Sequence, residues 1–354
     1  MSKPVYRVPT MREIEALPWN GFKVASTFSG CGGSCLGYRM AGYRVVYACE
    51  FIEEAQRTYK ANHPQSFLDT RDIREVKATD VLDKAGVDRG ELDLFDGSPP
   101  CSAFSTAGKR EAGWGQVKAY SDKAQRVDDL FFEYVRLIDG IRPKVFVAEN
   151  VSGLVKGTAK SYFKRILAAL REPGYRVSCR VLDAQWLGVP QSRQRTIFVG
   201  VRDDLNLDPV HPEPFPYRYS VAEGVADVPP PGPNELRSLA MTTKTERLWR
   251  KTLPGNNLSA ACMEETGKGS FFNMVKLSPL KPSPTITATC QQFHWDEFRY
   301  LTIPEAKRLC GFPDDFVLTG DFLQRFERCG RSVPPLMMKQ IAKTIEEKIL
   351  RCAA

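Results

Sequence analysis

The clearest chemical signal in this 354-residue sequence is a cysteine that follows two prolines. The stretch LDLFDG (92–97) has the composition of a buried strand and runs directly into Ser98-Pro99-Pro100-Cys101. Proline restricts the backbone angle φ, so the thiol would be held rigidly at the carboxyl end of a strand, where α/β proteins build their sites. Most free cysteines are small buried hydrophobic residues. The position of Cys101 instead favours a reactive thiol, and the polar segment after it (102–126) is typical of a mobile lid.

A carboxylic acid, Glu149, ends another predicted strand, KVFVAEN (144–150). Because neighbouring parallel strands end at the same edge of a sheet, Glu149 could lie beside Cys101. No histidine is near in the sequence, and a carboxylic acid next to a thiolate suits proton donation to a substrate ring better than activation of the thiol. Without Cys101 as a neighbour, Glu149 would be interpreted as a helix-capping or surface carboxylate.

A glycine-rich turn, Ser29-Gly30-Cys31-Gly32-Gly33, follows the first predicted strand. Glycines at a strand-to-helix turn let the backbone approach a ligand, and the helix N-terminus favours anionic groups. Glu50 ends the second strand, where a side chain can reach ribose hydroxyls. Cys35 occupies the sixth position of G-x-G-x-x-G, which counts against NAD and favours another adenosine-containing cofactor. An ordinary tight turn explains the glycines equally well.

Strand and helix patterns alternate from about residue 22 to residue 202. This alternation predicts an α/β fold with a doubly wound, Rossmann-like sheet. The last two strands are separated only by WLGVPQSRQ, too short for a helical crossover, which predicts an antiparallel hairpin at one sheet edge. The predicted strands are 22–28, 43–50, 92–97, 144–150, 175–184 and 196–202, and the predicted helices are 55–62, 127–141 and 162–170.

The composition changes after Arg202. Proline and acidic residues fill 203–235, and the next sixty residues are rich in Gly, Ser and Thr without a long helical period. This composition predicts a smaller, irregular, β-rich domain. We therefore expect a catalytic domain at 20–202 completed by a C-terminal helix within 326–354, a second domain at 203–298, and a connector at 299–325.

The cysteine content, the hydropathy and the net charge limit the expected cellular location, metal binding and partners of this protein. The chain has ten cysteines, but its polar start has no signal-peptide pattern and no segment could span a bilayer, so a cytoplasmic protein with reduced thiols is expected. Cys31 and Cys35 have no second pair at metal spacing, so no metal site is expected. The 50 Lys and Arg exceed the 42 Asp and Glu by 8, which permits a polyanionic partner.

Six motifs in this order resemble the motif set of DNA (cytosine-5) methyltransferases of the bacterial or phage, restriction–modification type. The resemblance extends from about Phe22 to the last helix, with the region between the fourth and fifth motifs matching only in outline. The motifs are Phe28-Ser-Gly-Cys-Gly-Gly, Pro99-Pro100-Cys101, Glu149-Asn150-Val151, Gln191-Ser-Arg193-Gln-Arg195, the Arg299–Phe316 segment and Gly330-Arg-Ser-Val-Pro.

The resemblance implies the fold of S-adenosylmethionine-dependent methyltransferases, with S-adenosyl-L-methionine as cofactor. Glu50 matches the ribose ligand and Phe51 the ring that stacks on adenine. Asp72 and Ile73 match the pair that reads the adenine edge. The remaining matches are Phe28, Gly30, Gly32 and Gly33 at the methionine end, Gly97 and Pro99 beside the sulfonium, Leu130 as a packing contact, and Ser332 from the last motif.

The resemblance also implies a mechanism. The Cys101 thiolate attacks carbon 6 of cytosine, Glu149 holds ring nitrogen 3 and supplies a proton, the methyl group joins carbon 5, and elimination frees the thiol. A stacked base is out of reach, so the cytosine must be flipped out of double-stranded DNA. Arg193 and Arg195 match residues that hold the flipped base and its phosphates.

The region 203–298 corresponds to the part of such enzymes that recognises the target sequence. The DNA-contact candidates are Ser105, Lys109, Gln191, Arg193, Arg195, Arg237, Lys244, Arg247 and Thr285. Residues 203–298 hold 9 basic and 12 acidic residues, but 237–281 alone hold 8 and 3. We therefore expect DNA to meet the catalytic domain and 237–281, with the acidic stretch 203–235 away from the phosphates.

Two departures from the family pattern are Ser102, where Gln or Asn is usual, and Arg331, where Asn is usual. Arg331 would either pair with the carboxylate of the cofactor or point to solvent. The alternatives are an RNA cytosine-5 methyltransferase of the transfer-RNA type and a catalytically silent nucleic-acid-binding regulator. The former lacks support because no Cys-Phe-Thr segment occurs in 203–298. We expect a monomer in a bacterial or phage-infected cell, with a restriction endonuclease as a genetic companion at most.

Overall fold

The computed structural model describes residues 3–100, 129–155, 160–232 and 242–353, and the backbone alone of 118–120 and 123–125. The chain forms two compact units. The sheet unit contains Arg12–Asp183, Gln194–Glu213 and Met337–Ala354, and the second unit contains Met1–Met11, Ala184–Arg193 and Pro214–Leu336. These bounds differ from the predicted ranges, because 184–193 and 299–336 group with the second unit.

A seven-stranded sheet forms the centre of the sheet unit, in the order β3-β2-β1-β4-β7-β9-β8. The first five strands in this order are parallel, and β9 runs antiparallel to both β7 and β8. The predicted doubly wound sheet and its antiparallel edge pair are confirmed. The strands are β1 Lys23–Thr27, β2 Arg44–Cys49, β3 Phe67–Asp69, β4 Leu94–Gly97, β7 Val145–Val151, β8 Tyr175–Asp183 and β9 Gln194–Arg202.

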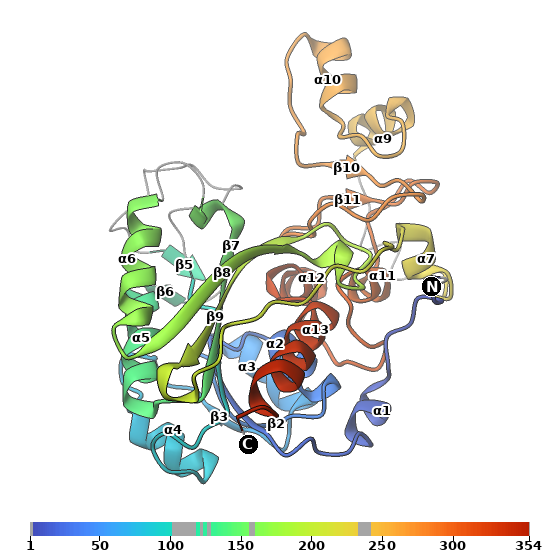
Figure 1. Cartoon of the computed structure of the whole chain (residues 1–354). Helices are drawn as coiled ribbons and strands as arrows, with labels where there is room; N and C mark the ends of the chain where they lie inside the picture. The colour runs from blue at the N-terminus through green and yellow to red at the C-terminus, as the bar shows by residue number, and fades with distance from the viewer. Residues whose placement is uncertain are drawn as a thin grey trace. The chain divides into compact units, whose positions relative to one another are not determined.

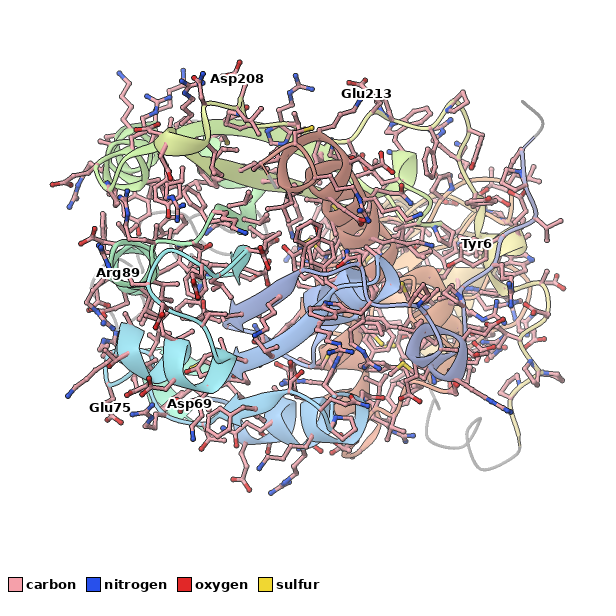
Figure 2. The ribbon with its side chains drawn as sticks, turned by 60° about the horizontal axis from the view of Figure 1, so that its bottom comes forward. Tyr6, Asp69, Glu75, Arg89, Asp208 and Glu213 are labelled. Carbon is pink, nitrogen blue, oxygen red and sulfur yellow. The ribbon has the colours of Figure 1, made fainter. Side chains whose placement is uncertain are left out.

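Strand β3 was absent from the sequence prediction. It has only three residues, and Phe67 is 42% exposed, so no apolar alternation marks it. It pairs with β2 at the edge of the sheet. Asp69 at its end, labelled in Figure 2, accepts a hydrogen bond from the Tyr47 hydroxyl at 2.9 Å. The edge strand is therefore fixed by one side-chain bond as well as by its short ladder.

Helices cover both faces of this sheet (Figure 1). On one face, α4, α5 and α6 pack on the strands and form the larger hydrophobic core. On the other face, α2, α3 and α13 lie together (Figure 1). The bounds are α1 Met11–Glu15, α2 Gly33–Met40, α3 Glu53–Asn62, α4 Ala78–Ala85, α5 Leu130–Ile141, α6 Lys160–Arg171 and α13 Pro335–Ile345, with single turns at Ser152–Val155, Asp203–Leu205 and Glu346–Leu350.

Tyr134 of α5 joins the helix layer to the strands that carry the candidate site. Its ring stacks on Phe95 with centroids 5.1 Å apart, and its single hydroxyl hydrogen is shared between the backbone carbonyls of Phe95 and Val147, 3.0 and 2.9 Å away. These carbonyls belong to β4 and β7, which are neighbours in the sheet. One buried side chain thus holds both strands against α5.

The described part of the second unit is largely irregular and contains more helix than strand, which corrects the expectation of a β-rich domain. A small core of Leu248, Trp249, Leu258, Cys262 and Phe293 packs α9 against α10. α9 has nine residues and α10 has eight, so neither is long enough to show a sustained helical period in the sequence. The elements of the second unit are Ala184–Trp186 (one 3₁₀ turn), α7 Val221–Val225, α9 Thr243–Lys251, α10 Ser259–Thr266, β10 Val275–Lys276, β11 Gln292–Phe293, α11 Ile303–Leu309 and α12 Phe322–Arg331. A separate backbone hairpin, β5 Lys118–Tyr120 and β6 Lys123–Gln125, belongs to the sheet unit.

The pairing of β7 with β9 depends on a glycine. Gly200 lies opposite Phe146, and a Cβ atom on Gly200 would stand 2.0 Å from the Phe146 ring. We predict that Gly200→Ala lowers the free energy of unfolding by about 1–3 kcal/mol, since overpacking a buried contact forces the ring or the strand to move. Urea unfolding measures this change. Gly232→Ala is the control, because a Cβ atom there meets nothing within 4 Å, and an equal loss in both variants would contradict the packing argument.

Candidate active site

The turn after β1 has a backbone that only a glycine-rich sequence adopts readily. Phe28, Gly30 and Gly32 all have positive φ, at 53°, 57° and 91°. A Cβ atom on Gly32 would strike the His63 ring at 2.2 Å, whereas one on Gly30 would meet nothing within 4 Å. Gly32 is therefore required by packing, and Gly30 presents an open side that a ligand can approach. Gly33 begins α2, whose amino end faces this turn.

Glu50 holds the same turn from the end of β2. One carboxylate oxygen accepts the backbone N–H of Gly30 at 2.7 Å, and the other accepts the N–H of Ile52 at 2.7 Å. Glu50 is buried, and Phe51 beside it is half-buried. A carboxylate is an acceptor that hydroxyl groups can donate to. The position of Glu50 at the end of β2, where it anchors the turn, makes it a candidate for binding hydroxyl groups of a ligand.

Asp72 and Ile73 follow β3 and lie close to the start of α5. Arg74 donates to Asp72 at 3.0 Å and to Asp129 at 2.8 Å. Asp129 directly precedes Leu130, which is buried in the core, as is Ile73. The arginine thus joins the segment after β3 to the helix that begins at Leu130. The four strand ends after β1, β2, β3 and β4 meet at one sheet edge because the strands are parallel.

Asn150 holds the segment that leads to the cysteine. Its side-chain amide donates to the carbonyl of Pro99 at 3.1 Å, and its own oxygen accepts the N–H of Val151 at 2.8 Å. Gly97 at the end of β4 has no room for a side chain, since a Cβ atom would lie 2.4 Å from the Tyr134 ring. Cys101, Ser105, Lys109 and Arg237 lie outside the described residues.

Glu149 and Arg195 form an ion pair beside this segment. Arg195 Nε lies 2.7 Å from Glu149 Oε1, and the two side chains are only 15% and 11% exposed. Glu149 pairs with Ile197 across β7 and β9, so Arg195 is its diagonal neighbour on the same face. Arg195 also donates to the carbonyl of Gln194 at 2.8 Å. Within the described residues, Glu149 Oε2 and Arg195 Nη2 make no other hydrogen bond.

Arg193 and Gln191 have a different environment from the one expected of DNA contacts. Arg193 is 2% exposed, and its two terminal nitrogens donate to the carbonyls of Ile286 and Gly330 at 2.9 and 2.8 Å. Gln191 is fully buried, donates to the carbonyl of Leu309 and accepts the N–H of Ile286. Buried carbonyls need donors, and these side chains supply them. Both residues therefore join separate segments inside the second unit.

The other expected residues of the second unit are more exposed. Thr285 is half-buried and donates to the carbonyl of Ser192 at 2.8 Å. Lys244 on α9 is exposed, 5.6 Å from the Phe271 ring, whereas Arg247 pairs with Glu265 of α10 at 2.9 Å. Ser332 follows α12 and donates to the carbonyl of Arg328. Arg331 is 45% exposed and pairs with Glu327, which favours its orientation toward solvent.

Sequence reasoning missed two residues of the site. The sequence marks Asn150 only as part of a motif and does not indicate that its side-chain amide donates to the carbonyl of Pro99. Asp96 is buried in β4, and burial raises the pKa of its carboxyl to about 7, with the charge of Glu149 adding to the rise and hydrogen bonds from Ser26 and Tyr38 opposing it. The available signal was that Asp96 is one of two acidic residues in LDLFDG, a segment predicted to be a buried strand.

The fold and this strand edge define a Rossmann-like enzyme with a glycine turn, a ribose-type carboxylate and a carboxylate–arginine pair. The profile of the C-5 cytosine-specific DNA methylases matches residues 22–347. The chain is similar to Type II methyltransferase M1.HphI of Haemophilus parahaemolyticus, with 30% identity over 327 residues that cover 90% of this chain and 85% of the relative. It is 31% identical to M.PspPI of a Psychrobacter strain, covering 94% and 81%. The chain therefore belongs to the C-5 cytosine-specific DNA methylase family and is a DNA methyltransferase.

Solved structures agree with the fold. A protein described as a prophage-encoded DNA modification methyltransferase of E. coli superposes with a TM-score of 0.73 at 22% identity, over 93% of this chain and 99% of that one. Spodoptera frugiperda DNMT2 superposes with a TM-score of 0.62 at 17% identity, over 94% and 99%. Within the described residues, no helix is long and apolar enough to cross a membrane.

The bond from Asn150 to Pro99 yields a prediction. Removing the amide frees the Pro99 carbonyl, and a small displacement of a reacting group costs about tenfold to a hundredfold in rate. We predict that Asn150→Ala lowers kcat by about tenfold or more, with a smaller change in KM for DNA. Steady-state methylation assays measure both constants. Asn20→Ala, which also removes an amide–carbonyl bond in the sheet unit, should leave kcat near the wild-type value, and equal losses would contradict the assignment.

Proposed function

We propose that this enzyme transfers a methyl group from S-adenosyl-L-methionine to carbon 5 of a flipped-out cytosine in a specific sequence of double-stranded DNA, through a covalent bond between Cys101 and carbon 6. The observation that carries the proposal is the Glu149–Arg195 pair beside the Pro99 segment that leads to Cys101. The paired Glu149 carboxylate and Arg195 guanidinium offer an acceptor and donors close together. That pattern suits the edge of a cytosine ring.

The residues would act in sequence. The Cys101 thiolate forms a bond to carbon 6, and the ring electrons move toward nitrogen 3, where Glu149 supplies a proton. Carbon 5 would then bond to the methyl group as the bond from that group to the sulfonium sulfur breaks, which leaves a neutral thioether. A base removes the proton from carbon 5, the electrons of that bond expel the Cys101 thiolate from carbon 6, and nitrogen 3 returns its proton to Glu149. Arg195 would hold the ring and orient Glu149, whereas Arg193 and Gln191 would act as positioning residues within the second unit.

The residues around the glycine turn fit the proposed cofactor. S-adenosyl-L-methionine supplies an electrophilic methyl group on sulfur. The open side of Gly30 and the amino end of α2 suit its methionine end, and Glu50 suits the ribose hydroxyls. Phe51, Asp72 and Ile73 remain the candidates for adenine, and Ser332 for the methionine end. Glu50 holds the Gly30 N–H and lies at the end of β2, which supports this arrangement.

Covalent trapping tests the proposed mechanism. With fluorine at carbon 5 there is no proton for the base to remove, so elimination cannot follow methyl transfer and the protein stays bound to the DNA. We predict that duplex DNA with 5-fluorocytosine at the target, together with S-adenosyl-L-methionine, forms an adduct that survives denaturing electrophoresis. Cys101→Ser should abolish the adduct, and Cys352→Ser, at an exposed cysteine, should not. An adduct formed equally by Cys101→Ser would exclude this mechanism.

The DNA-facing side of the second unit is proposed to include the exposed face of α9. Lys244 lies on this face, and its ammonium forms no ion pair in the described part of the chain. Each phosphate contact contributes about 0.9 to the slope of log K against log salt. We predict that Lys244→Ala lowers this slope by about 0.9 in fluorescence-anisotropy titrations between 50 and 200 mM salt. Lys84→Ala, at an exposed lysine of the sheet unit, is the control, and equal slopes in all three proteins would remove Lys244 from the interface.

The biological setting is also a proposal. We infer a cytoplasmic monomer in a bacterial or phage-infected cell that acts without a bound partner, even where a restriction endonuclease is encoded nearby. Bisulfite sequencing of DNA from an expressing host identifies the target site. Unmodified DNA in that experiment would favour the RNA methyltransferase or the catalytically silent regulator.

A further inference from the structure

A buried carboxylate that the methylation mechanism does not use lies beneath the glycine turn. Asp96 of β4 is 1% exposed. Its Oδ2 accepts the hydroxyl of Ser26 at 2.9 Å, and its Oδ1 accepts the hydroxyl of Tyr38 at 3.0 Å. Within the described residues, no lysine or arginine forms an ion pair with it. The charge is therefore supported by hydrogen bonds alone.

These hydrogen bonds reach both ends of the turn. Ser26 lies in β1, directly across from Asp96, and Ser29 inside the turn donates to the Ser26 hydroxyl at 3.2 Å. Tyr38 lies in α2, the helix that follows the turn. Asp96 thus links the strand before the turn, the turn itself and the helix after it. Glu50 holds the Gly30 N–H of the same turn from β2.

The turn needs such support because its backbone is strained. Phe28 has a φ of 53°, a left-handed conformation that is unfavourable for a residue with a side chain. Strained conformations persist only when the surroundings determine them strongly. Ionised Asp96 accepts from Ser26 and Tyr38 at once. A protonated carboxyl must donate one hydrogen, so one hydroxyl would have to reverse its role.

We propose that Asp96 is a positioning residue for the cofactor, whose ionised carboxylate holds the Phe28–Gly32 turn in its binding conformation. The proposal rests on the proposed function, because it takes this turn as the site of S-adenosyl-L-methionine. Protonation of Asp96 rearranges the bonds to Ser26 and Tyr38 and loosens the turn. Cofactor binding therefore weakens as the pH falls through the pKa of Asp96, which is about 7.

The buried tyrosines, the cysteine and the histidine around Asp96 have pKa values shifted away from the range near pH 7. On α2, burial raises the pKa of Cys35 to about 12 and that of Tyr38 well above its usual value. Burial likewise raises the pKa of Tyr134 on α5 and of Tyr59 on α3. His63, beside Gly32, has its pKa lowered to about 3 by burial and so stays neutral. The remaining charged neighbour is Glu149 of β7. Its proposed role is toward the cytosine, so cofactor binding is measured without DNA.

Calorimetric titration of the full-length protein with S-adenosyl-L-methionine at pH 6, 7 and 8, without DNA, tests the proposal. The Kd of the wild type should rise by up to about tenfold from pH 8 to pH 6, the limit for one group that titrates near pH 7. Asp96→Asn should bind weakly at every pH with no such rise. Asp93→Asn is the matched control, because Asp93 is buried at the other end of the same strand, where it pairs with Lys144 at 2.8 Å. It should keep the pH dependence of the wild type.

Tyr38→Phe provides a test that does not rely on Asp96→Asn folding. The Tyr38 hydroxyl favours the ionised carboxylate, so its loss should move the midpoint of the pH dependence above that of the wild type. A purely structural role for Asp96 would leave the midpoint unchanged. Wild-type Kd independent of pH, or a pH dependence retained in Asp96→Asn, would overturn the proposal. A wild type that binds no S-adenosyl-L-methionine at any pH would overturn the cofactor assignment itself, and the role of Asp96 with it.

Discussion

The common direction of five strands is the constraint on which the site depends. β3, β2, β1, β4 and β7 are parallel, so their carboxyl ends all reach one edge of the sheet. The glycine turn, Glu50, Asp72, the Pro99 segment and Glu149 each follow or end one of these strands. Residues more than a hundred positions apart therefore gather at one edge. The helices on both faces keep the strands buried and the edge fixed.

The reversal of one strand completes the arrangement. β9 runs antiparallel to β7, so its first residues meet the last residues of β7, and Arg195 comes beside Glu149. The register of this pair is set further along, where the Phe146 ring fills the space above Gly200. A shift of one residue would turn Arg195 to the opposite face. Packing far from the site thus decides whether the ion pair can form.

Three carboxylates at this edge have different surroundings, and these surroundings suit them to different tasks. Glu50 accepts two backbone N–H groups. Glu149 faces an arginine. Within the described residues, Asp96 accepts hydrogen bonds from two hydroxyl groups, and its burial raises its pKa to about 7. Chemically similar side chains are separated in function by burial and by the charge of their partners.

The sequence alone determined the sheet class, the antiparallel edge pair and the family, because strand periodicity, short connections and ordered motifs are local signals. It also made Glu50 and Glu149 candidates because each ends a predicted strand, and the family resemblance added Arg195. Only the tertiary structure revealed β3, the helical character of the second unit and the partners of Arg193, Asn150 and Asp96. These features depend on contacts between segments distant in sequence, and burial by such contacts, rather than residue type, decides whether an arginine or a carboxylate faces a substrate or supports the backbone.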